Sequence, residues 1–343
     1  MDKNIAILGT GAIGSCVGAD LTKAGYDVLL IDQWPAHIEA MKTHGLHVKM
    51  PNEEFHAQVR ALHLCELCTI QPQFDIVFLT AKSYDTLWMV QFIKPYLKPD
   101  GVLVSLQNSL NDEWITPIIG YERDIGSVVE LSAEIFEPGH VKRNSDQGRT
   151  WFALGELHGR ITPRLKEIAE ILRNTGRGDI TTNIWGAKWS KLVVNSMISG
   201  VCGIFGVRDW ELVQKPELLE ISINLGKESL LVGTTLGYHL EPIFGMSAED
   251  FLGAADEVLK KSLTTLVSHI GKEARSMVFQ DHLKGRRTEI DYINGLVVRK
   301  GREAKIPTPL NEAVTSVTKQ IELGKLKPNL CNLSEIRNIV MTD

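Results

Sequence analysis

The first half of the chain alternates short apolar runs with amphipathic stretches. Continuous apolar runs of this length are typical of parallel strands that are buried on both faces. The predicted strands occupy residues 4–8, 26–32, 74–82 and 101–110, and the predicted helices between them occupy residues 15–25 and 83–97. Residues 124–141 and 150–157 then indicate strand after strand, which favours an antiparallel edge. This pattern predicts an α/β fold.

The second half of the chain loses the strand pattern, and long amphipathic segments dominate it from Ile184 onward. The predicted helices occupy residues 185–200, 216–236, 247–269, 289–304 and 309–323. Pro216 stands where the first turn of a helix tolerates proline. Ser247 has the residue type preferred at an N-cap and is followed by two acidic residues within three positions. We therefore expect this part of the chain to be all-α.

A glycine-rich segment, GTGAIG, joins the first predicted strand to the helix after it. Its G-x-G-x-x-G register is the signature of a dinucleotide-binding turn when a strand precedes it and a helix follows. The first glycine permits the tight turn, the second lets the backbone approach a pyrophosphate, and the third allows close helix–strand packing. The helix N-terminus offers N–H groups and a positive dipole end to phosphates. The predicted cofactor contacts of this loop are Gly9, Thr10, Gly11, Ala12, Ile13 and Gly14.

Asp32 closes the second predicted strand, where a dinucleotide-binding domain presents an acid to the adenosine ribose. A carboxylate there accepts hydrogen bonds from the ribose hydroxyls and repels a 2′-phosphate, so we expect NAD(H) to be favoured over NADP(H). Asp32 could instead be an ordinary turn residue, but the glycine context favours the ribose role. The predicted fold is a Rossmann-type dinucleotide-binding domain over residues 1–183 and an all-α domain over residues 184–343.

Lys82 and Asn108 follow two later predicted strands. Ligands of open α/β sheets bind beyond the carboxyl ends of the strands, which makes both residues candidates for the ligand site. Their position alone fits a solvated loop lysine and a turn asparagine equally well.

The composition limits the classes of function. The chain has 343 residues, 43% of them hydrophobic, and a net charge of -5, which suits a globular protein of two domains and argues against nucleic-acid binding. No stretch approaches the ~20 uninterrupted apolar residues of a membrane span. The N-terminal residues lack a signal-peptide pattern and the five cysteines are an odd number, so we expect a cytoplasmic protein.

Cys65 and Cys68 have the C-x-x-C spacing. A zinc site would need two further ligands at similar spacing, and the sequence contains no second pair. A redox motif would open a helix after a strand, whereas this pair lies in a strand-like stretch before a turn. We interpret the spacing as incidental. The histidines also show no metal-binding spacing.

Four polar residues form one line along the otherwise apolar helix of the second half. Lys188, Lys191, Asn195 and Ser199 are separated by three, four and four positions, so they share one side of the helix. A single lysine in such a place is most simply a surface residue whose stem covers apolar neighbours. The complete stripe, in a chain that also carries a dinucleotide motif, favours a catalytic role.

The chain resembles the ketopantoate reductase (2-dehydropantoate 2-reductase) family. The matching stretches are ILGTGAIGS, LTAKSYDT, LQNSLND, WSKLVVNSMIS and QDHLKGRRTEIDYINGLVVRKGREAKIPTP, and they follow the family's order over nearly the whole chain. The last stretch is the most specific of them.

The resemblance implies a role for each matching residue. Lys191 matches the general acid that protonates the carbonyl oxygen, and Asn195 matches the asparagine that holds the substrate. Glu289 matches a glutamate that pairs with this lysine and binds a substrate hydroxyl, although by itself it could simply open a helix. Lys82 and Asn108 match cofactor- and substrate-side residues of the first domain.

The chain departs from the family pattern around the substrate. Ser199 stands where many members carry a second asparagine, and Ser109 replaces a glycine that is usual after Asn108. The family's substrate-binding serine aligns with Met277, so that Ser276 lies one place earlier. We therefore include Ser199 and Ser276 with Asn195 and Asn108 as expected substrate contacts. Asp32 also differs from the basic or small polar residue of NADPH-using members.

Hydride addition to a ketone builds negative charge on its oxygen, and an amine beside that oxygen supplies both a charge and a proton. The leading hypothesis is therefore a nicotinamide-dependent reductase of a small 2-keto acid, with 2-dehydropantoate as the substrate that the resemblance implies. An NAD-dependent paralogue that acts on a different hydroxy or keto compound is the alternative. A non-catalytic dinucleotide sensor is a further hypothesis. The apolar helix over residues 218–231 could bury against a second copy in a homodimer or fill its own core.

Overall fold

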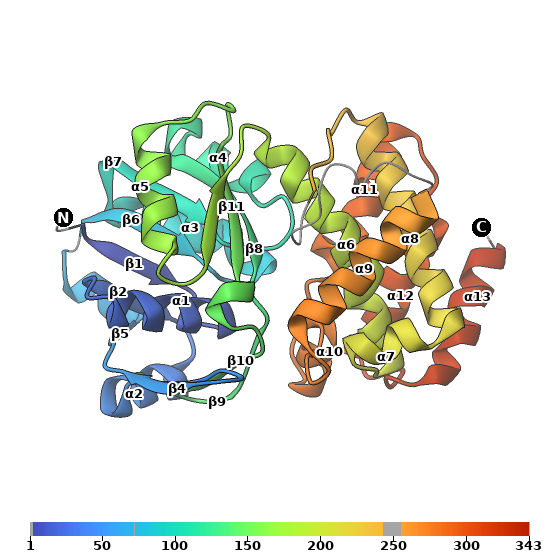
Figure 1. Ribbon diagram of the computed structural model, residues 1–343, viewed down its shortest axis with the longest axis horizontal. Coiled ribbons are helices and arrows are strands. Elements are labelled where there is room, and N and C mark those ends of the chain that lie inside the picture. The colour runs from blue at the N-terminus through green and yellow to red at the C-terminus, as the bar shows by residue number, and fades with distance from the viewer. Residues whose placement is uncertain (1–2, 72, 243–254, 343) are drawn as a thin grey trace. The chain divides into compact units, whose positions relative to one another are not determined.

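The computed structural model describes residues 3–71, 73–242 and 255–342, which belong to two compact units (Figure 1). Unit 1 comprises Met1–Ile184 and unit 2 comprises Trp185–Asp343. The domain boundary predicted from the sequence, between residues 183 and 184, lies one residue before this division.

Unit 1 contains the strands and the helices that alternate with them. Its strands are β1 (Ile5–Leu8), β2 (Val28–Asp32), β3 (Leu46–Lys49), β4 (Glu54–Ala57), β5 (Arg60–His63), β6 (Phe74–Leu79), β7 (Leu97–Ser105), β8 (Asp124–Glu130), β9 (Ala133–Glu137), β10 (His140–Arg143), β11 (Trp151–Glu156) and β12 (Arg177–Ile180). Its α-helices are α1 (Ala12–Lys23), α2 (Pro35–His44), α3 (Thr86–Ile93), α4 (Asp112–Ile119) and α5 (Pro163–Leu172).

Within the described residues, eight strands form one sheet in the order β12-β11-β8-β7-β6-β1-β2-β5. The six strands from β8 to β5 are parallel to their neighbours, while β11 runs antiparallel to β8. The predicted α/β fold and its antiparallel edge are therefore confirmed. In this order β2 and β6 flank β1, so the loops that follow these three strands lie at the same edge of the sheet.

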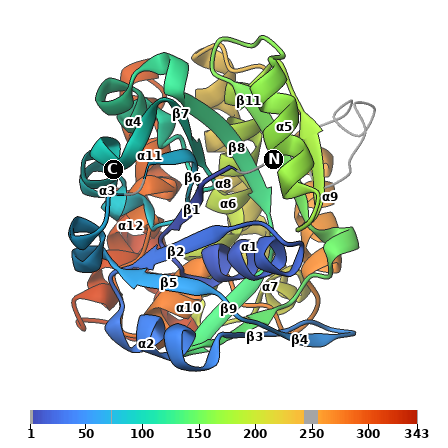
Figure 2. The ribbon, with the colours of Figure 1, turned by 90° about the vertical axis from the view of Figure 1, so that its left-hand side faces the viewer.

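The central strands are buried on both faces because helices cover both sides of the sheet (Figure 2). Along β1, Ile5 and Ile7 face a core that includes residues of α1 and α5. Ala6 and Leu8 point the other way, into a core formed with α3 and α4. This alternation follows from the two-residue period of a strand, and it explains why β1 is a continuous apolar run.

A second sheet covers the outer side of α1. It has the order β4-β3-β10-β9, and Leu46, Val48 and Val141 of its strands pack into the same core as α1. The sequence analysis did not predict it. Cys65 and Cys68, which were expected in a strand-like stretch, lie in a 3-10 helix (Leu64–Thr69) that follows β5.

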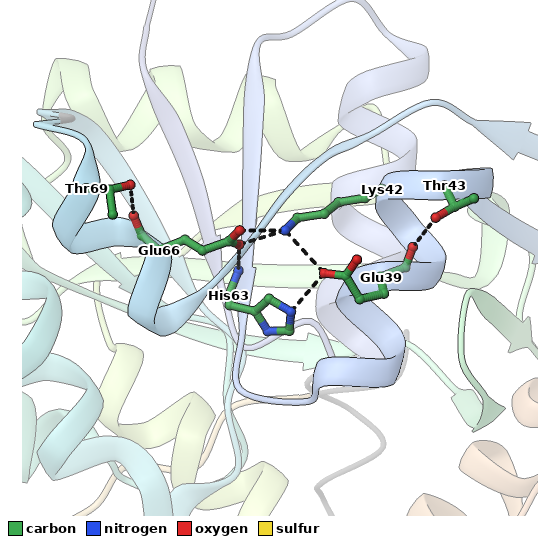
Figure 3. Close-up of polar contacts among 6 residues, drawn as sticks. All are labelled: Glu39, Lys42, Thr43, His63, Glu66 and Thr69. Atoms are coloured by element: carbon green, nitrogen blue, oxygen red, sulfur yellow. Dashed lines mark hydrogen bonds and ion pairs between the residues drawn. The ribbon is translucent and has the colours of Figure 1, made fainter.

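Charged side chains tie α2 to the end of β5 (Figure 3). The Lys42 amine binds both oxygens of Glu66, at 2.7 and 2.8 Å, and also contacts Glu39 at 3.3 Å. His63, at the end of β5, bonds to Glu39 at 3.0 Å. These contacts lower the pKa of both glutamates: a hydrogen bond from His63 has the largest effect on Glu39, and one from Lys42 on Glu66. His63 pairs in register with Asp32, so the network braces the sheet edge beside the predicted cofactor site.

A fully buried ion pair connects α1 to β10. The Arg143 guanidinium donates to Asp20 at 2.7 Å, to the Thr150 hydroxyl at 2.7 Å and to the Thr175 carbonyl at 2.6 Å. Both charged side chains are fully buried. Burial raises the pKa of Asp20 to about 6, and the charge of Arg143 opposes this shift.

Unit 2 is helical, as predicted. Its α-helices are α6 (Ile184–Phe205), α7 (Asp209–Gln214), α8 (Pro216–Thr235), α9 (Ala255–Ile270), α10 (Met277–Leu283), α11 (Asn294–Ala304), α12 (Pro309–Glu322) and α13 (Leu333–Thr342). Residues 247–254 of one predicted helix lie outside the described residues. The sequence analysis missed α7, α10 and α13.

The helix predicted over residues 289–304 begins later than expected. Glu289 precedes a short 3-10 helix (Ile290–Tyr292), and α11 starts only after Ile293. The backbone of Ile293 has φ -113° and ψ -93°, which is not a helical conformation and separates the two segments.

Helix α6 is buried along nearly its whole length, and small residues let α8 approach it closely. The hydroxyls of Ser196 and Ser229 are 2.8 Å apart. The Trp189 indole donates to the Ser229 carbonyl, and a Cβ added at Gly233 would lie 1.8 Å from the indole nitrogen. The absence of a side chain at Gly233 therefore makes room for Trp189.

We expect Arg143→Met to lower the free energy of unfolding by about 3–5 kcal/mol, because it leaves the Asp20 carboxylate buried without its cation. Urea denaturation measures the change. Arg173→Met is the matched control, since Arg173 pairs with Glu170 at the surface of the same unit, and a pair of that kind contributes at most about 1 kcal/mol. An equal decrease in the free energy of unfolding in the two variants would show that the buried ion pair contributes no more to stability than the surface pair.

Candidate cofactor site and catalytic helix

The three glycines of the loop between β1 and α1 differ in what surrounds them. Gly9 has φ +93°, a conformation that other residues rarely adopt, and a Cβ there would lie 2.7 Å from the Ala81 nitrogen. A Cβ on Gly14 would lie 2.3 Å from the Gly9 oxygen and 2.5 Å from the Thr80 hydroxyl. A Cβ on Gly11 would meet nothing within 4 Å. The backbone at Gly11 is therefore the part of the loop that is open to a ligand.

The Asp32 carboxylate holds this loop against the end of β2. Its Oδ2 accepts a hydrogen bond from the Thr10 amide, and its Oδ1 accepts one from the Trp34 amide at 2.7 Å. Asp32 is only 9% exposed. The residue that the sequence assigned to the ribose is thus also a structural support of the glycine loop.

A buried chain of hydrogen bonds through Ser15 and His37 also supports the glycine loop. The Ser15 hydroxyl donates to the Thr10 carbonyl at 2.9 Å and lies 3.1 Å from His37 Nε2. The Gly139 amide donates to His37 Nδ1 at 2.9 Å. Since Nδ1 accepts, the proton of the neutral imidazole lies on Nε2, which donates to Ser15. Neither Ser15 nor His37 was identified from the sequence.

The loops after β6 and β7 are tied to the glycine loop and to each other. The Thr80 hydroxyl donates to the Gly9 carbonyl. The side-chain amide of Gln107 donates to the Ala81 carbonyl at 2.8 Å, and the side-chain amide of Asn111 donates to the Ser83 hydroxyl at 3.0 Å.

These loops bring together the predicted residues of the first domain. Lys82 and Asn108 follow neighbouring parallel strands, as expected, at the edge that also carries Gly9–Gly14 and Asp32. Thr80, Gln107 and Asn111 were missed. The only signal for them was their place just beyond the ends of β6 and β7.

Ser109 adopts φ +75°, in the left-handed region that favours glycine. This is the position at which the chain departs from the glycine of the family pattern. The Asn111 amide bonds to the Asn108 carbonyl at 3.1 Å and closes the turn around it.

The loop fits the pyrophosphate of a dinucleotide. The N–H groups in the first turn of α1 have no acceptor within the helix. Gly11, the N-cap residue, makes no side-chain cap, and the first turn contains no acidic residue. An anion at this position would satisfy these donors and interact favourably with the helix dipole.

In unit 2, the polar stripe of α6 lies on a helix with almost no solvent exposure. Lys188, Asn195 and Ser199 are 2%, 4% and 1% exposed, and Lys191 is half-buried. Regular helix geometry places the four side chains on one side, as predicted.

Side chains of residues that follow α6 in the chain donate hydrogen bonds to its backbone carbonyls. Ser276 donates to the Ser199 carbonyl at 3.4 Å, and the Asn294 amide donates to the Ser196 carbonyl at 3.0 Å. His282 Nδ1 lies 3.1 Å from the Gly203 carbonyl, which can only accept, so the imidazole donates from Nδ1. The structure thus brings Ser276 beside Ser199, two residues predicted as substrate contacts.

Glycines of α6 allow these segments to approach. A Cβ on Gly203 would lie 2.3 Å from the Val278 side chain, and one on Gly200 would lie 3.1 Å from Ile290. Ile290 follows Glu289 directly, and Glu289 is 4% exposed. The close packing at Gly200 therefore holds the segment that carries Glu289 against the helix of Lys191.

All five cysteines are free thiols. Burial raises the pKa of Cys16 to about 12, and burial, reinforced by Asp209, raises the pKa of Cys202 well above its ordinary value. Neither thiol is a nucleophile, since the reactive species is the thiolate. In the described part of the chain, no group of three or more His, Cys, Asp or Glu side chains is arranged to hold a metal ion.

A mostly parallel sheet with a glycine-rich dinucleotide loop, followed by a helical unit, is typical of two-domain nicotinamide-dependent oxidoreductases. Residues 5–156 match the family described as Ketopantoate reductase PanE/ApbA, and residues 183–322 match the family described as Ketopantoate reductase PanE/ApbA C terminal. The chain belongs to the ketopantoate reductase PanE/ApbA family.

Relatives match over nearly their whole length. A protein of Archaeoglobus fulgidus named 2-dehydropantoate 2-reductase is 33% identical over 94% of this chain and 99% of the relative. A protein of the same name from Pyrococcus horikoshii is 30% identical over 93% of this chain and 97% of the relative. The predictions of the family and of an oxidoreductase acting on a CH–OH group are therefore confirmed.

Solved structures share the fold. D-mandelate dehydrogenase in complex with NADH and anilino(oxo)acetate is 27% identical, with a TM-score of 0.82 over 94% of this chain and 99% of that one. A PanE/ApbA family ketopantoate reductase from Ralstonia eutropha is 25% identical, with a TM-score of 0.78 over 94% of this chain and 99% of that one. Over the described ranges, no helix has both the length and the apolar character of a membrane span.

We expect the stability of unit 2 to fall in mildly acidic solution because of His282. Its Nε2 has no hydrogen-bond partner among the described residues, and burial lowers the pKa of the imidazole, against the opposing effects of the Gly203 carbonyl, Glu322 and Asp281. As the pH falls through about 6.5, the unfolded chain therefore binds a proton before the folded chain does. The stability that the neutral imidazole contributes is present above this pH and is lost below it.

The variant His282→Asn keeps a donor near the position of Nδ1 but does not titrate. Chemical denaturation at about pH 7.5 and about pH 5.5 should show a smaller loss of unfolding free energy for this variant than for the wild type. His239→Asn, at an exposed position of the same unit, is the control and should behave like the wild type. Identical pH dependence in all three proteins would contradict the role of His282.

Proposed function

We propose that the protein reduces a small 2-keto acid to its 2-hydroxy acid with NADH, and that Lys191 is the general acid. The main support for the proposal is that one chain of this family contains both a dinucleotide-binding loop and a buried line of polar residues. One is the Asp32-supported glycine loop, and the other is the buried polar stripe of α6.

The preference for NAD(H) rests on Asp32. It lies at the end of β2, where a ribose meets a dinucleotide-binding sheet. Two backbone amides bind its oxygens and fix the carboxylate in place. A fixed negative charge rejects a 2′-phosphate more strongly than one that can turn away. The complex of the related D-mandelate dehydrogenase with NADH supports the same preference.

The bound nicotinamide would supply the hydride to the carbonyl carbon. Lys191 donates a proton to the carbonyl oxygen as negative charge develops there, so that a hydroxyl group is formed and the amine is left neutral. The half-buried position of Lys191 suits this role, because water competes less with the oxygen for the amine. Glu289, on the segment packed against α6, pairs with the lysine and binds a substrate hydroxyl.

The remaining predicted residues bind the acid itself. Asn195 lies one turn beyond Lys191 on the same side of α6 and donates to the substrate carboxylate or the reacting oxygen. Ser199 lies a further turn along, and Ser276 bonds to its carbonyl. Asn108 provides a contact from the loop after β7. The spacing of Lys191, Asn195 and Ser199 along α6 thus sets the distances between three contacts to a small polar acid.

A second candidate is an NAD-dependent dehydrogenase of a hydroxy acid other than pantoate. It is favoured by the departures from the family pattern at Ser109, Ser199 and Met277, and by the similarity to D-mandelate dehydrogenase, whose structure contains anilino(oxo)acetate.

We further propose that the protein forms a homodimer through α8. The side chain of Leu231 on this helix is 53% exposed in the single chain, and a second copy would cover it.

Steady-state assays with NADH and NADPH against a panel of 2-keto acids test the proposed function. We expect turnover of 2-dehydropantoate and a higher kcat/KM with NADH. Turnover of another keto acid alone would favour the second candidate. A protein that binds NADH but turns over no member of the panel would instead be a sensor.

We expect Lys191→Ala to lower kcat by about 10²–10⁴-fold, the usual contribution of general acid catalysis. Titration calorimetry should show unchanged NADH binding. Lys191→Arg keeps the positive charge but cannot give up a proton, and should recover only a small part of the rate. Lys227→Ala, on the exposed face of α8, is the control with wild-type turnover. Wild-type kcat in Lys191→Ala would exclude the assigned role.

A further inference from the structure

A second carboxylate contacts the residue that follows Asp32. Asp85 ends the 3-10 helix Ser83–Asp85, in the loop between β6 and α3. Its Oδ2 accepts a hydrogen bond from the side-chain amide of Gln33 at 3.2 Å, and its Oδ1 accepts one from the Trp88 indole at 2.8 Å. Gln33 is the residue that follows Asp32. The contact therefore joins the loop after β2 to the loop after β6, across the end of β1.

The position of Asp85 is fixed by its surroundings. Its amide donates to the Lys82 carbonyl at 2.9 Å. The next residue, Thr86, is fully buried and accepts a hydrogen bond from Gln107 at 2.9 Å. Since both carboxylate oxygens and the backbone are engaged, Asp85 cannot swing away from an approaching ligand without breaking these contacts.

The contact also fixes the direction of the Gln33 amide. A carboxylate only accepts hydrogen bonds, so the amide nitrogen of Gln33 must face Asp85 and its oxygen must point elsewhere. Gln33 is exposed, and Trp88 is 38% exposed. The cluster therefore adds a negative charge to the loop that contacts Gln33, the residue after Asp32. Such a charge tolerates ribose hydroxyls, which can donate hydrogen bonds, and repels a phosphate dianion.

We propose that Asp85 is a second determinant of cofactor choice, which rejects the 2′-phosphate of NADP(H) together with Asp32. This inference rests on the proposed binding of a dinucleotide at the glycine loop. A 2′-phosphate carries a charge of about -1.5 to -2 at neutral pH, so each fixed carboxylate near it weakens binding. Lys82, three positions earlier in the loop, carries the opposite charge, so the effect of Asp85 has to be measured by removing Asp85 alone.

The test compares the dissociation constants of NADH and NADPH, measured by titration calorimetry, for the wild type and three variants. Asp85→Asn removes the charge and keeps the shape. We expect it to raise the affinity for NADPH relative to NADH by about fivefold or more, as nearby charges in a water-like medium would. Asp85→Glu keeps the charge and should keep the wild-type ratio. Asp100→Asn, an exposed residue near the start of β7, is the control and should leave the ratio unchanged.

The change should also weaken as salt is added, since exposed charges are screened. A ratio that is unchanged in Asp85→Asn, or changed equally in Asp85→Glu, would overturn the role of Asp85. The two proposals fail separately. The dissociation constants of the wild type test the proposed preference for NAD(H). The change in the ratio of the NADH and NADPH dissociation constants on substitution tests the role of Asp85, whichever cofactor the wild type prefers.

Discussion

The hydrogen bond from the Thr10 amide to the Asp32 carboxylate is the constraint on which the candidate cofactor site depends. It joins the glycine loop to the end of the neighbouring strand and leaves the first turn of α1 open at Gly11. The chain of hydrogen bonds through Ser15 and His37 holds the carbonyl side of the same peptide segment. The loop is therefore shaped before any ligand arrives, and binding energy need not be spent on ordering it.

The helical unit obtains its rigidity in a comparable way. Carbonyl groups of α6 accept hydrogen bonds from Ser276, His282 and Asn294, which lie some 80–100 residues later in the chain. A helix carbonyl has a second lone pair available after its helical hydrogen bond is made. Glycines on the same helix let these segments come close enough to use it. Residues remote from Lys191 in sequence thus determine how firmly its surroundings are held.

The sequence allowed the fold class and the glycine loop to be predicted, because these depend on local periodicity and spacing. The ribose role of Asp32 stays a prediction, and its hydrogen bonds to the Thr10 and Trp34 amides were not foreseen. The sequence did not reveal His37, Thr80 or Asp85. Their contacts join segments that are far apart in the chain, and apart from the place of Thr80 just beyond β6 their immediate neighbours do not distinguish them from ordinary polar residues. The second sheet was missed because its strands are short and half-exposed. The helix expected from Glu289 onward begins only at Asn294, because the non-helical backbone at Ile293 separates it from the preceding 3-10 helix.

Ser109 has a consequence for how the chain can diverge. A left-handed backbone costs an L-residue about 1–2 kcal/mol; glycine adopts it routinely, and asparagine and aspartate adopt it occasionally. Serine occupies it here with φ +75°, in a turn that the hydrogen bond from the Asn111 side chain to the Asn108 carbonyl closes. Valine, isoleucine and threonine are closed to this position unless the turn itself is rebuilt. Substitutions directly after Asn108 are therefore restricted, and a change in the contacts of this loop has to come from neighbouring positions.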